Sequence, residues 1–306
     1  MLEVLNVTKI YKKSNRKIIA NDNISLTIPN GEVVGFLGGN GAGKTTLIKS
    51  ICNLIRPTSG QISFLGKNIH SNPDFVRRKV GVMLEGARNL YNFLTVDANL
   101  SYFSLLNKLD HKKAIIEQDR LLELFGLIKE RKSTVNQLSR GMQQKVAIIV
   151  AILKDPDLLI LDEPTLGLDV VAQADLKALL LDIIKKRNKT LVICTHDTSL
   201  INDVCKNIAV FNKGKLLEYG ALDTLRNKSS ASNYSIILKN SEDNFLRLTE
   251  RYSGFGIESH GETLEIIVDS LESIFTEIEF SDILKVEKRS KTIEQYLVQL
   301  TGGNNE

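Results

Sequence analysis

Residues 38–45, which read GGNGAGKT, combine the residue types needed to bind the phosphates of a nucleotide. They fit the pattern G-x-x-x-x-G-K-[ST] and lie between a strand predicted at 32–37 and a helix predicted at 45–54. Glycines let backbone N–H groups close around phosphate oxygens, and the helix start directs positive dipole charge at the same anion. We expect Lys44 to contact the β- and γ-phosphates and Thr45 to ligate Mg²⁺. The predicted nucleotide-binding residues of this segment are Gly38, Asn40, Gly41, Ala42, Gly43, Lys44, Thr45 and Thr46.

Two adjacent carboxylates, Asp162 and Glu163, follow a second buried strand predicted at 158–161. In a parallel sheet this places them at the carboxyl edge, beside the phosphate-binding loop. We expect Asp162 to hold Mg²⁺, directly or through water, and Glu163 to accept the proton of an attacking water. The alternative is that the carboxylates cap the turn at Pro164. The phosphate loop alone does not separate a transporter ATPase from a kinase, a GTPase or a helicase.

The surrounding pattern predicts an α/β fold that positions these groups. Alternating apolar residues predict half-buried strands at 2–7 and 23–28, and apolar residues at helical spacing predict helices from 95 to about 137. Strand and helix signals then alternate from 158 to 212. This alternation predicts a parallel sheet with crossover helices, interrupted by an inserted helical segment.

Residues 138–145, LSRGMQQK, are called here the signature segment, because they resemble the L-S-G-G-Q signature of the ABC ATPases. The resemblance covers roughly the first 220 residues and includes the other expected motifs in order. It implies a P-loop NTPase core with an antiparallel β-subdomain and a helical subdomain inserted at about 95–145. By this similarity Ser139 and Gly141 bind the γ-phosphate of ATP held by a second subunit. Arg140 and Met142 depart from the family pattern, and Ser139 could instead only cap its helix.

Further positions match the family one by one. Asp169, in the segment TLGLD at 165–169, resembles the carboxylate of the loop that communicates across the ATPase dimer. His196 resembles the switch histidine that contacts the γ-phosphate. Tyr11 stands where an aromatic ring stacks on adenine, although a tyrosine at a strand end can also simply pack. Glu85 replaces the glutamine that normally reaches the Mg²⁺ and the attacking water, so its place in the site stays open. The resemblance thus assigns catalysis to Lys44, Glu163 and His196.

Composition is that of an ordinary globular protein, and charge alone does not decide its function. The 306 residues are 42% hydrophobic and 25% charged, with a mean hydropathy of -0.06. The longest uncharged apolar run, 146–153, is far shorter than the roughly 20 residues of a membrane-crossing helix, and residues 1–8 lack the features of a secretory signal. We therefore expect a peripheral protein on the cytoplasmic side of the membrane, bound to a transmembrane permease on a separate chain.

The same resemblance implies a second ATPase subunit, here a homodimer, and no nucleic acid partner. A soluble ABC ATPase of ribosomes or DNA is the runner-up, but such proteins carry two ATPase units or long coiled coils, and this chain shows one unit and no sustained heptads. An ordinary P-loop kinase disagrees with residues 138–141 and His196 together.

A small-polar stretch at 228–233 separates the predicted ATPase domain, 1–227, from a C-terminal α+β domain at 234–306. Its elements are predicted as a strand at 234–239, a helix at 242–252, a hairpin through His260, a helix from Ser270, a strand at 283–286 and a helix at 292–300, an order that suggests a ferredoxin-like unit. Residues 292–302 resemble the tail of export-type subunits of the drug and antibiotic-resistance branch. This favours an exporter. The domain could regulate the ATPase, stabilise its dimer, or be an inert appendage.

Overall fold

The computed structural model describes residues 1–13, 16–87, 89–187, 189–228, 233–240, 248, 257–268, 271, 278 and 280–289. The chain divides into two compact units, Met1–Leu222 and Asp223–Glu306. The helices predicted at 242–252 and from Ser270, apart from Leu248 and Leu271, lie outside the described residues, as do the helix at 292–300 and the tail at 292–302. None of the helices within the described ranges has the length and apolar character that crossing a bilayer requires.

An antiparallel sheet begins the first unit, with the strand order β2-β1-β4-β5. Its strands are β1 (Leu2–Lys13), β2 (Arg16–Ile28), β4 (Ser59–Phe64) and β5 (Lys67–Asn68). The strands predicted at 2–7 and 23–28 are the two ends of one long hairpin, paired from Leu2↔Ile28 to Lys13↔Arg16. Alternate residues of both strands, such as Leu2 and Val4, are buried, as expected for a sheet with one face on a core.

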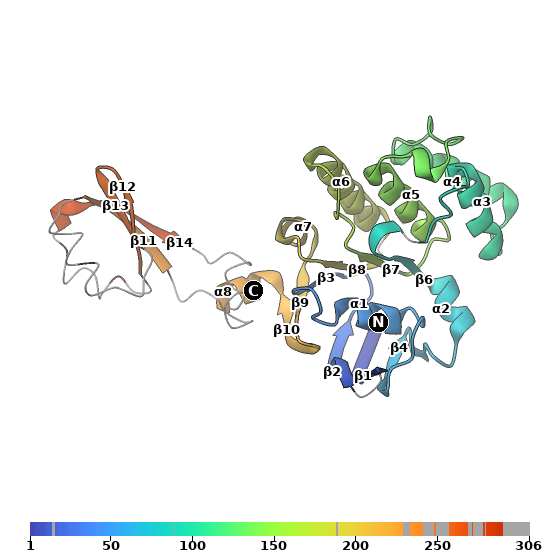
Figure 1. The fold of residues 1–306 in the computed structure, drawn as a ribbon, viewed down its shortest axis with the longest axis horizontal. Helices are drawn as coiled ribbons and strands as arrows, with labels where there is room; N and C mark the ends of the chain where they lie inside the picture. The colour runs from blue at the N-terminus through green and yellow to red at the C-terminus, as the bar shows by residue number, and fades with distance from the viewer. Residues whose placement is uncertain are drawn as a thin grey trace. The chain divides into compact units, whose positions relative to one another are not determined.

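A six-stranded sheet with the order β10-β9-β3-β8-β7-β6 forms the centre of this unit. Five of its strands are parallel, and β10 runs antiparallel to β9 at one edge. Every residue of β3, β7 and β8 is buried, because helices pack on both sides of the sheet (Figure 1). The strands are β3 (Val33–Leu37), β6 (Val80–Met83), β7 (Leu158–Asp162), β8 (Thr190–Thr195), β9 (Asn207–Asn212) and β10 (Lys215–Ala221). The predicted α/β class with a parallel sheet is confirmed.

Helices α1 (Lys44–Ile51), α2 (Pro73–Lys79), α6 (Val170–Arg187) and α7 (Thr198–Val204) connect these strands. Helix α1 carries the phosphate-binding loop at its start, and its fully buried Leu47, Ile48 and Ile51 lie in one core with residues of both sheets. It ends three residues before the prediction at 54, because Asn53 adopts a left-handed backbone with φ of 56° that cannot continue a right-handed helix. The loop is therefore anchored to the hydrophobic core of the unit.

The helical subdomain consists of α3 (Val96–Leu106), α4 (His111–Leu124) and the start of α5 (Arg140–Ile152), with short helices η1 (Glu85–Ala87) and η2 (Val135–Gln137) at its borders. Thr95 caps α3 by accepting a hydrogen bond from the N–H of Ala98 at 3.1 Å, and Asp110 caps α4 in the same way through Lys113 at 3.0 Å. The second half of α5 is buried against β6 and β7. This helix therefore joins the subdomain to the central sheet.

The second unit contains an antiparallel sheet with the order β12-β13-β11-β14. Its strands are β11 (Asn233–Lys239), β12 (Ile257–His260), β13 (Thr263–Val268) and β14 (Ile283–Arg289), and the remaining elements are α8 (Leu222–Lys228) and η3 (Phe280–Asp282). One face buries Ile236, Leu238, Leu264 and Ile266 together with Leu248. This strand order is compatible with a ferredoxin-like β-α-β-β-α-β unit.

Replacing Asn99 should destabilise the helical subdomain. This fully buried side chain accepts a hydrogen bond from the N–H of Tyr91 at 2.9 Å and donates to the carbonyls of Tyr91 and Thr95 at 3.1 and 3.0 Å. Asn99→Leu leaves these peptide groups without their partner, so we expect the free energy of unfolding to fall by about 1–3 kcal/mol. Thermal unfolding of the variant and of wild type measures this difference in the free energy of unfolding. Asn107→Ala, which removes a half-buried amide bonded to Phe103, should cost less, and an equal cost would contradict the account.

Candidate functional site

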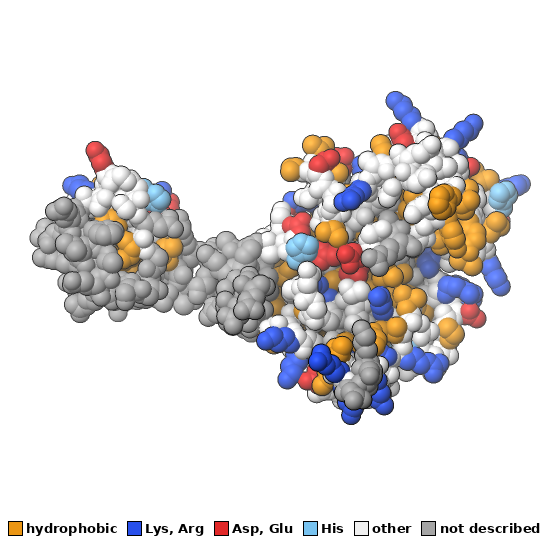
Figure 2. Space-filling view, in the orientation of Figure 1, with side chains coloured by type: hydrophobic (Ala, Val, Ile, Leu, Met, Phe, Trp, Pro, Cys, Tyr) orange, Lys and Arg blue, Asp and Glu red, His pale blue; other side chains and the backbone are white. Residues whose placement is uncertain are grey.

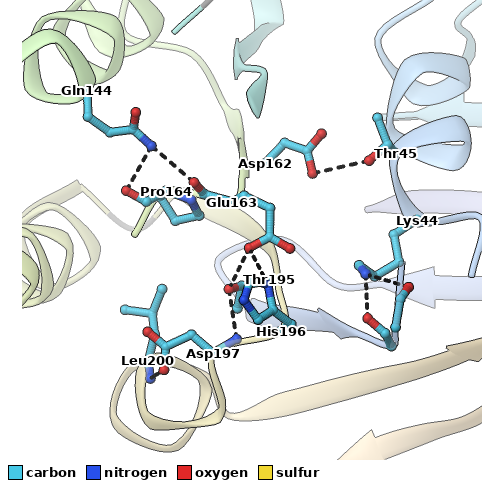
Figure 3. Close-up of polar contacts among 12 residues, drawn as sticks. Lys44, Thr45, Gln144, Asp162, Glu163, Pro164, Thr195, His196, Asp197 and Leu200 are labelled. Carbon is cyan, nitrogen blue, oxygen red and sulfur yellow. Dashed lines mark hydrogen bonds and ion pairs between the residues drawn. The ribbon is translucent and has the colours of Figure 1, made fainter. Parts of the chain in front are cut away.

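The phosphate-binding loop wraps around the ammonium group of Lys44, which is 6% exposed. Lys44 Nζ donates hydrogen bonds to the carbonyls of Gly38 and Gly39 at 2.5 and 3.2 Å (Figure 3). Gly43 precedes α1 with φ of 99°, and a Cβ at this position would lie 2.3 Å from the carbonyl oxygen of Ala20. Only glycine can therefore bring the chain so close to β2 at the start of α1.

The Asp162 carboxylate lies at the end of β7, opposite the start of α1. Thr45 Oγ1 donates a hydrogen bond to Asp162 Oδ1 at 3.5 Å, whereas Asp162 Oδ2 is buried without a hydrogen-bond partner. Burial raises the pKa of this carboxyl above its ordinary value of 3.8, and hydrogen bonds from Cys194 and Thr45 lower it in part. A buried anionic oxygen without a partner beside a hydroxyl is a donor set that fits Mg²⁺, which accepts one or two protein oxygens and takes its other ligands from water and phosphate.

Glu163 adopts an unusual backbone conformation. Its φ of 49° is rare for a residue with a side chain, and Pro164 follows it directly. The carboxylate Oε2 accepts a hydrogen bond from Thr195 Oγ1 at 3.0 Å and lies 3.1 Å from His196 Nδ1 (Figure 3). The Glu163 side chain is 12% exposed and that of His196 is 62% exposed. A carboxylate that is largely buried but lines the cleft can accept a proton from a water bound there.

Two residues that hold this turn were not identified from the sequence. Thr195, fully buried at the end of β8, joins the Glu163 carboxylate to the N–H of Asp197. Gln144 of α5 donates from Nε2 to the carbonyls of Glu163 and Pro164, each at 3.0 Å. The signal for Gln144 was its position, because a polar residue on the apolar side of a helix needs a buried partner.

A cleft of about 440 Å³ brings the predicted groups together. Ile18, Ile19 and Ala20 of β2, with Gly39 and Leu166, complete its wall without having been predicted. Tyr11 is 38% exposed, so its ring is accessible to a flat ligand. Gly38 takes part in the site through its carbonyl group, which accepts a hydrogen bond from Lys44. The predicted residues that line the cleft are Tyr11, Asn40, Gly41, Ala42, Gly43, Lys44, Thr45, Thr46, Glu85, Glu163 and His196.

Five predicted residues are not among the described residues that line this cleft: Gly38, Ser139, Gly141, Asp162 and Asp169. Gly38 and Asp162 are hydrogen-bonded to the lining residues Lys44 and Thr45, whereas the other three lie elsewhere. Ser139 is exposed and caps α5, accepting a hydrogen bond from the N–H of Met142 at 3.3 Å. Asp169 caps α6 in the same way through Ala172 at 2.8 Å. The aliphatic part of Arg140 lies alongside Gly167. The signature segment therefore meets the loop after β7 within the chain, while its helix start faces outward.

The parallel sheet, the glycine-rich loop at the start of α1 and the acidic end of β7 together define a P-loop nucleoside triphosphatase. Residues 21–166 match the ABC transporter family. The bacitracin transport ATP-binding protein BcrA of Bacillus licheniformis is 32% identical over 309 residues, which cover 99% of this chain and 98% of that protein. The methionine import ATP-binding protein MetN 1 of Oenococcus oeni is 35% identical over 224 residues, 72% of this chain and 64% of that protein.

Among solved structures, the dimeric ATP-binding cassette MJ0796 in a post-hydrolysis state with ADP and phosphate matches with a TM-score of 0.67 and 27% identity, covering 72% of this chain and 99% of that one. The chain thus belongs to the ATP-binding proteins of ABC transporters. It is an ATP-binding subunit and an ATPase, and the resemblance carried by the signature segment is confirmed.

Substituting Asp162 should stabilise the nucleotide-free protein. Because burial raises its pKa, the folded chain holds the proton more tightly than the unfolded chain, and stability is lost as pH rises from 3.8 through the raised pKa. We expect Asp162→Asn to have a higher thermal midpoint than wild type at pH 7 without Mg²⁺, with the difference shrinking as pH falls. Asp157→Asn, which removes a carboxylate paired with Lys79 at 2.8 Å, should not stabilise. A less stable Asp162→Asn protein at pH 7 would contradict this prediction.

Proposed function

We propose that this chain powers transport as one of two identical ATPase subunits bound to a separate transmembrane permease, and that the transport is export. The observation that carries the proposal is an incomplete site. Lys44 and Glu163 line one cleft, whereas Ser139 opens a helix whose start faces outward. A second copy of the chain can supply that helix start to the cleft of the first.

The helix start has the chemistry needed for this role. Helix α5 is 13 residues long, so its first N–H groups carry a substantial positive dipole charge. Ser139 adds a hydroxyl and Gly141 adds a backbone without a side chain, and both suit a phosphate oxygen. The solved relative MJ0796 is dimeric and holds ADP and phosphate, which supports a two-chain arrangement.

Within the cleft each residue has a distinct part in the proposed hydrolysis. Lys44 leaves the Gly38 and Gly39 carbonyls and binds phosphate oxygens, and Tyr11 offers its ring to the base. Thr45 and Asp162 would hold Mg²⁺, which supplies positive charge to the phosphates when bound. Glu163 takes the proton from the attacking water. His196 contacts the γ-phosphate and, 3.1 Å from Glu163, keeps that carboxylate in line with the water.

An apolar surface on the helical subdomain supports a membrane partner. We call it the α3 surface; it includes Phe93, Leu105 and Ile116, which are 88%, 71% and 68% exposed. Tyr91 and Tyr102 add a hydrogen-bonded aromatic pair with ring centroids 5.0 Å apart. Hydrophobic side chains gather on this side of the molecule in Figure 2. Exposed apolar clusters of this kind mark protein or membrane contacts, so the chain binds its permease here from the cytoplasmic side.

The direction of transport is inferred from the share of the chain that each relative matches. The match to the bacitracin transport protein extends over 99% of the chain, and therefore includes the second unit. The match to the methionine import protein extends over 72%. Together with the export-type resemblance of residues 292–302, this favours export of a compound that the permease selects.

Glu163→Gln tests the proposed mechanism. Loss of the general base should slow phosphate release by about 10²- to 10⁴-fold, while ATP stays bound between two chains because the amide keeps the shape of the carboxylate. Light scattering should then show a stable ATP-dependent dimer. Lys44→Ala, which removes the phosphate contact, should give neither dimer nor turnover. If Glu163→Gln stays monomeric with ATP and the wild-type monomer hydrolyses ATP efficiently, the two-chain mechanism is wrong.

Phe93→Asp tests the α3 surface. A charge on the permease contact should reduce retention of the chain in the membrane fraction of cells that express it with its permease by about tenfold, the effect of 1.4 kcal/mol. ATP hydrolysis by the isolated subunit should stay unchanged, because Phe93 does not line the cleft. Leu284→Asp places the same charge on β14 of the second unit, where Leu284 is 51% exposed, and should be retained normally. An equal loss of membrane retention in both variants would refute a specific contact between the α3 surface and the permease.

A further inference from the structure

Gln144 is a buried amide with two backbone acceptors. Its side chain is 4% exposed, and Nε2 lies 3.0 Å from the carbonyl oxygens of both Glu163 and Pro164. These two carbonyls belong to consecutive residues of the turn that follows β7 (Figure 3). One NH₂ group thus satisfies both and fixes the direction of each peptide plane.

The turn needs such a restraint. Glu163 has φ of 49°, and Pro164 restricts the backbone of the residue before it. Conformations of this kind persist only where surrounding contacts hold them. The N–H of Glu163 donates to the carbonyl of Cys194 at 2.7 Å, which fixes the strand side of the residue, and Gln144 fixes the other side.

We infer that Gln144 is the positioning residue of Glu163, so that the same helix that begins at the signature segment also holds the general base in place. The inference rests on the proposed role of Glu163. Gln144 does not line the cleft and acts through the backbone that carries the carboxylate. Because Gln144 and Ser139 belong to one helix and its cap, a shift of the helix start on dimer formation moves the turn as well. ATP held by one chain thereby influences the base of the other chain's site.

Gln143 provides a matched control. It is the preceding residue of the same helix, and its Nε2 donates to the carbonyls of Val135 and Leu138 at 3.0 and 3.1 Å. Gln143 therefore makes the same pair of hydrogen bonds from one amide group. Its acceptors lie in the segment before Ser139 and not in the turn that carries Glu163. Methionine has nearly the volume of glutamine and no donor, so the same substitution isolates the amide at both positions.

The test places each substitution in wild type and in Glu163→Gln, and measures kcat, KM for ATP and single-turnover hydrolysis. Gln144→Met should lower kcat by about 10- to 100-fold, the usual effect of misplacing a catalytic group by about 1 Å, while KM and ATP-dependent dimer formation stay close to wild type. In the Glu163→Gln background it should change the residual rate less than about twofold, because the residue through which it acts is already disabled. Gln143→Met should slow both backgrounds by the same factor.

Two results would overturn the inference: an unchanged kcat in Gln144→Met, or an equal loss of rate in both backgrounds. If Gln144→Met does not fold, Gln144→Asn keeps the amide on a shorter side chain that cannot reach both carbonyls, and should show the same dependence on Glu163. Turnover by Glu163→Gln itself at the wild-type rate would instead refute the role proposed for Glu163, so the two failures are distinguishable.

Discussion

The repulsion between carboxylates and phosphates is the constraint on which the rest of the site depends. Glu163 and Glu85 line the cleft that we propose takes the phosphates of the nucleotide. Asp162, at the end of β7, is buried without a partner for one of its oxygens. Like charges a few ångströms apart repel strongly where water is scarce. In the proposed mechanism Lys44, the start of α1 and a bound divalent cation would together offset this charge. In the proposed mechanism the negative groups cannot be omitted, because Asp162 would hold the cation and Glu163 would take the proton.

The position of Glu163, the proposed general base, is determined by elements far apart in the chain. The left-handed backbone of Glu163 costs on the order of 1–3 kcal/mol, and it is maintained by hydrogen bonds from β8 and α5. Thr195 holds the carboxylate, Cys194 the N–H, and Gln144 the carbonyl. Since β8 is buried along its whole length and α5 packs on β6 and β7, the geometry of one side chain depends on the stability of the central sheet.

The sequence indicates the parts of this arrangement that are local. The glycine-rich loop, the apolar runs of β7 and β8 and the caps of the helices are each specified within a few residues. The four-residue strand β6 was not predicted, since Gly81 is typical of a turn; here its missing side chain makes room for the carbonyl of Ala151, 2.2 Å from where a Cβ would lie. Thr195 was not identified as a site residue because the pairing of β7 with β8 brings it to Glu163. The partners of Gln144 are brought near by the packing of α5 on the central sheet, so its position in the helix indicates a buried partner but not which one.

The length of α5 between Ser139 and Gln144 has a consequence for how such chains can diverge. A helix turns by about 100° for each residue, so one inserted or deleted residue in this stretch would swing the amide of Gln144 away from its two carbonyls while the helix start stayed in place. Substitutions such as Arg140 are compatible with the geometry, because they leave the register intact. The stretch can therefore vary in its side chains but not in its number of residues.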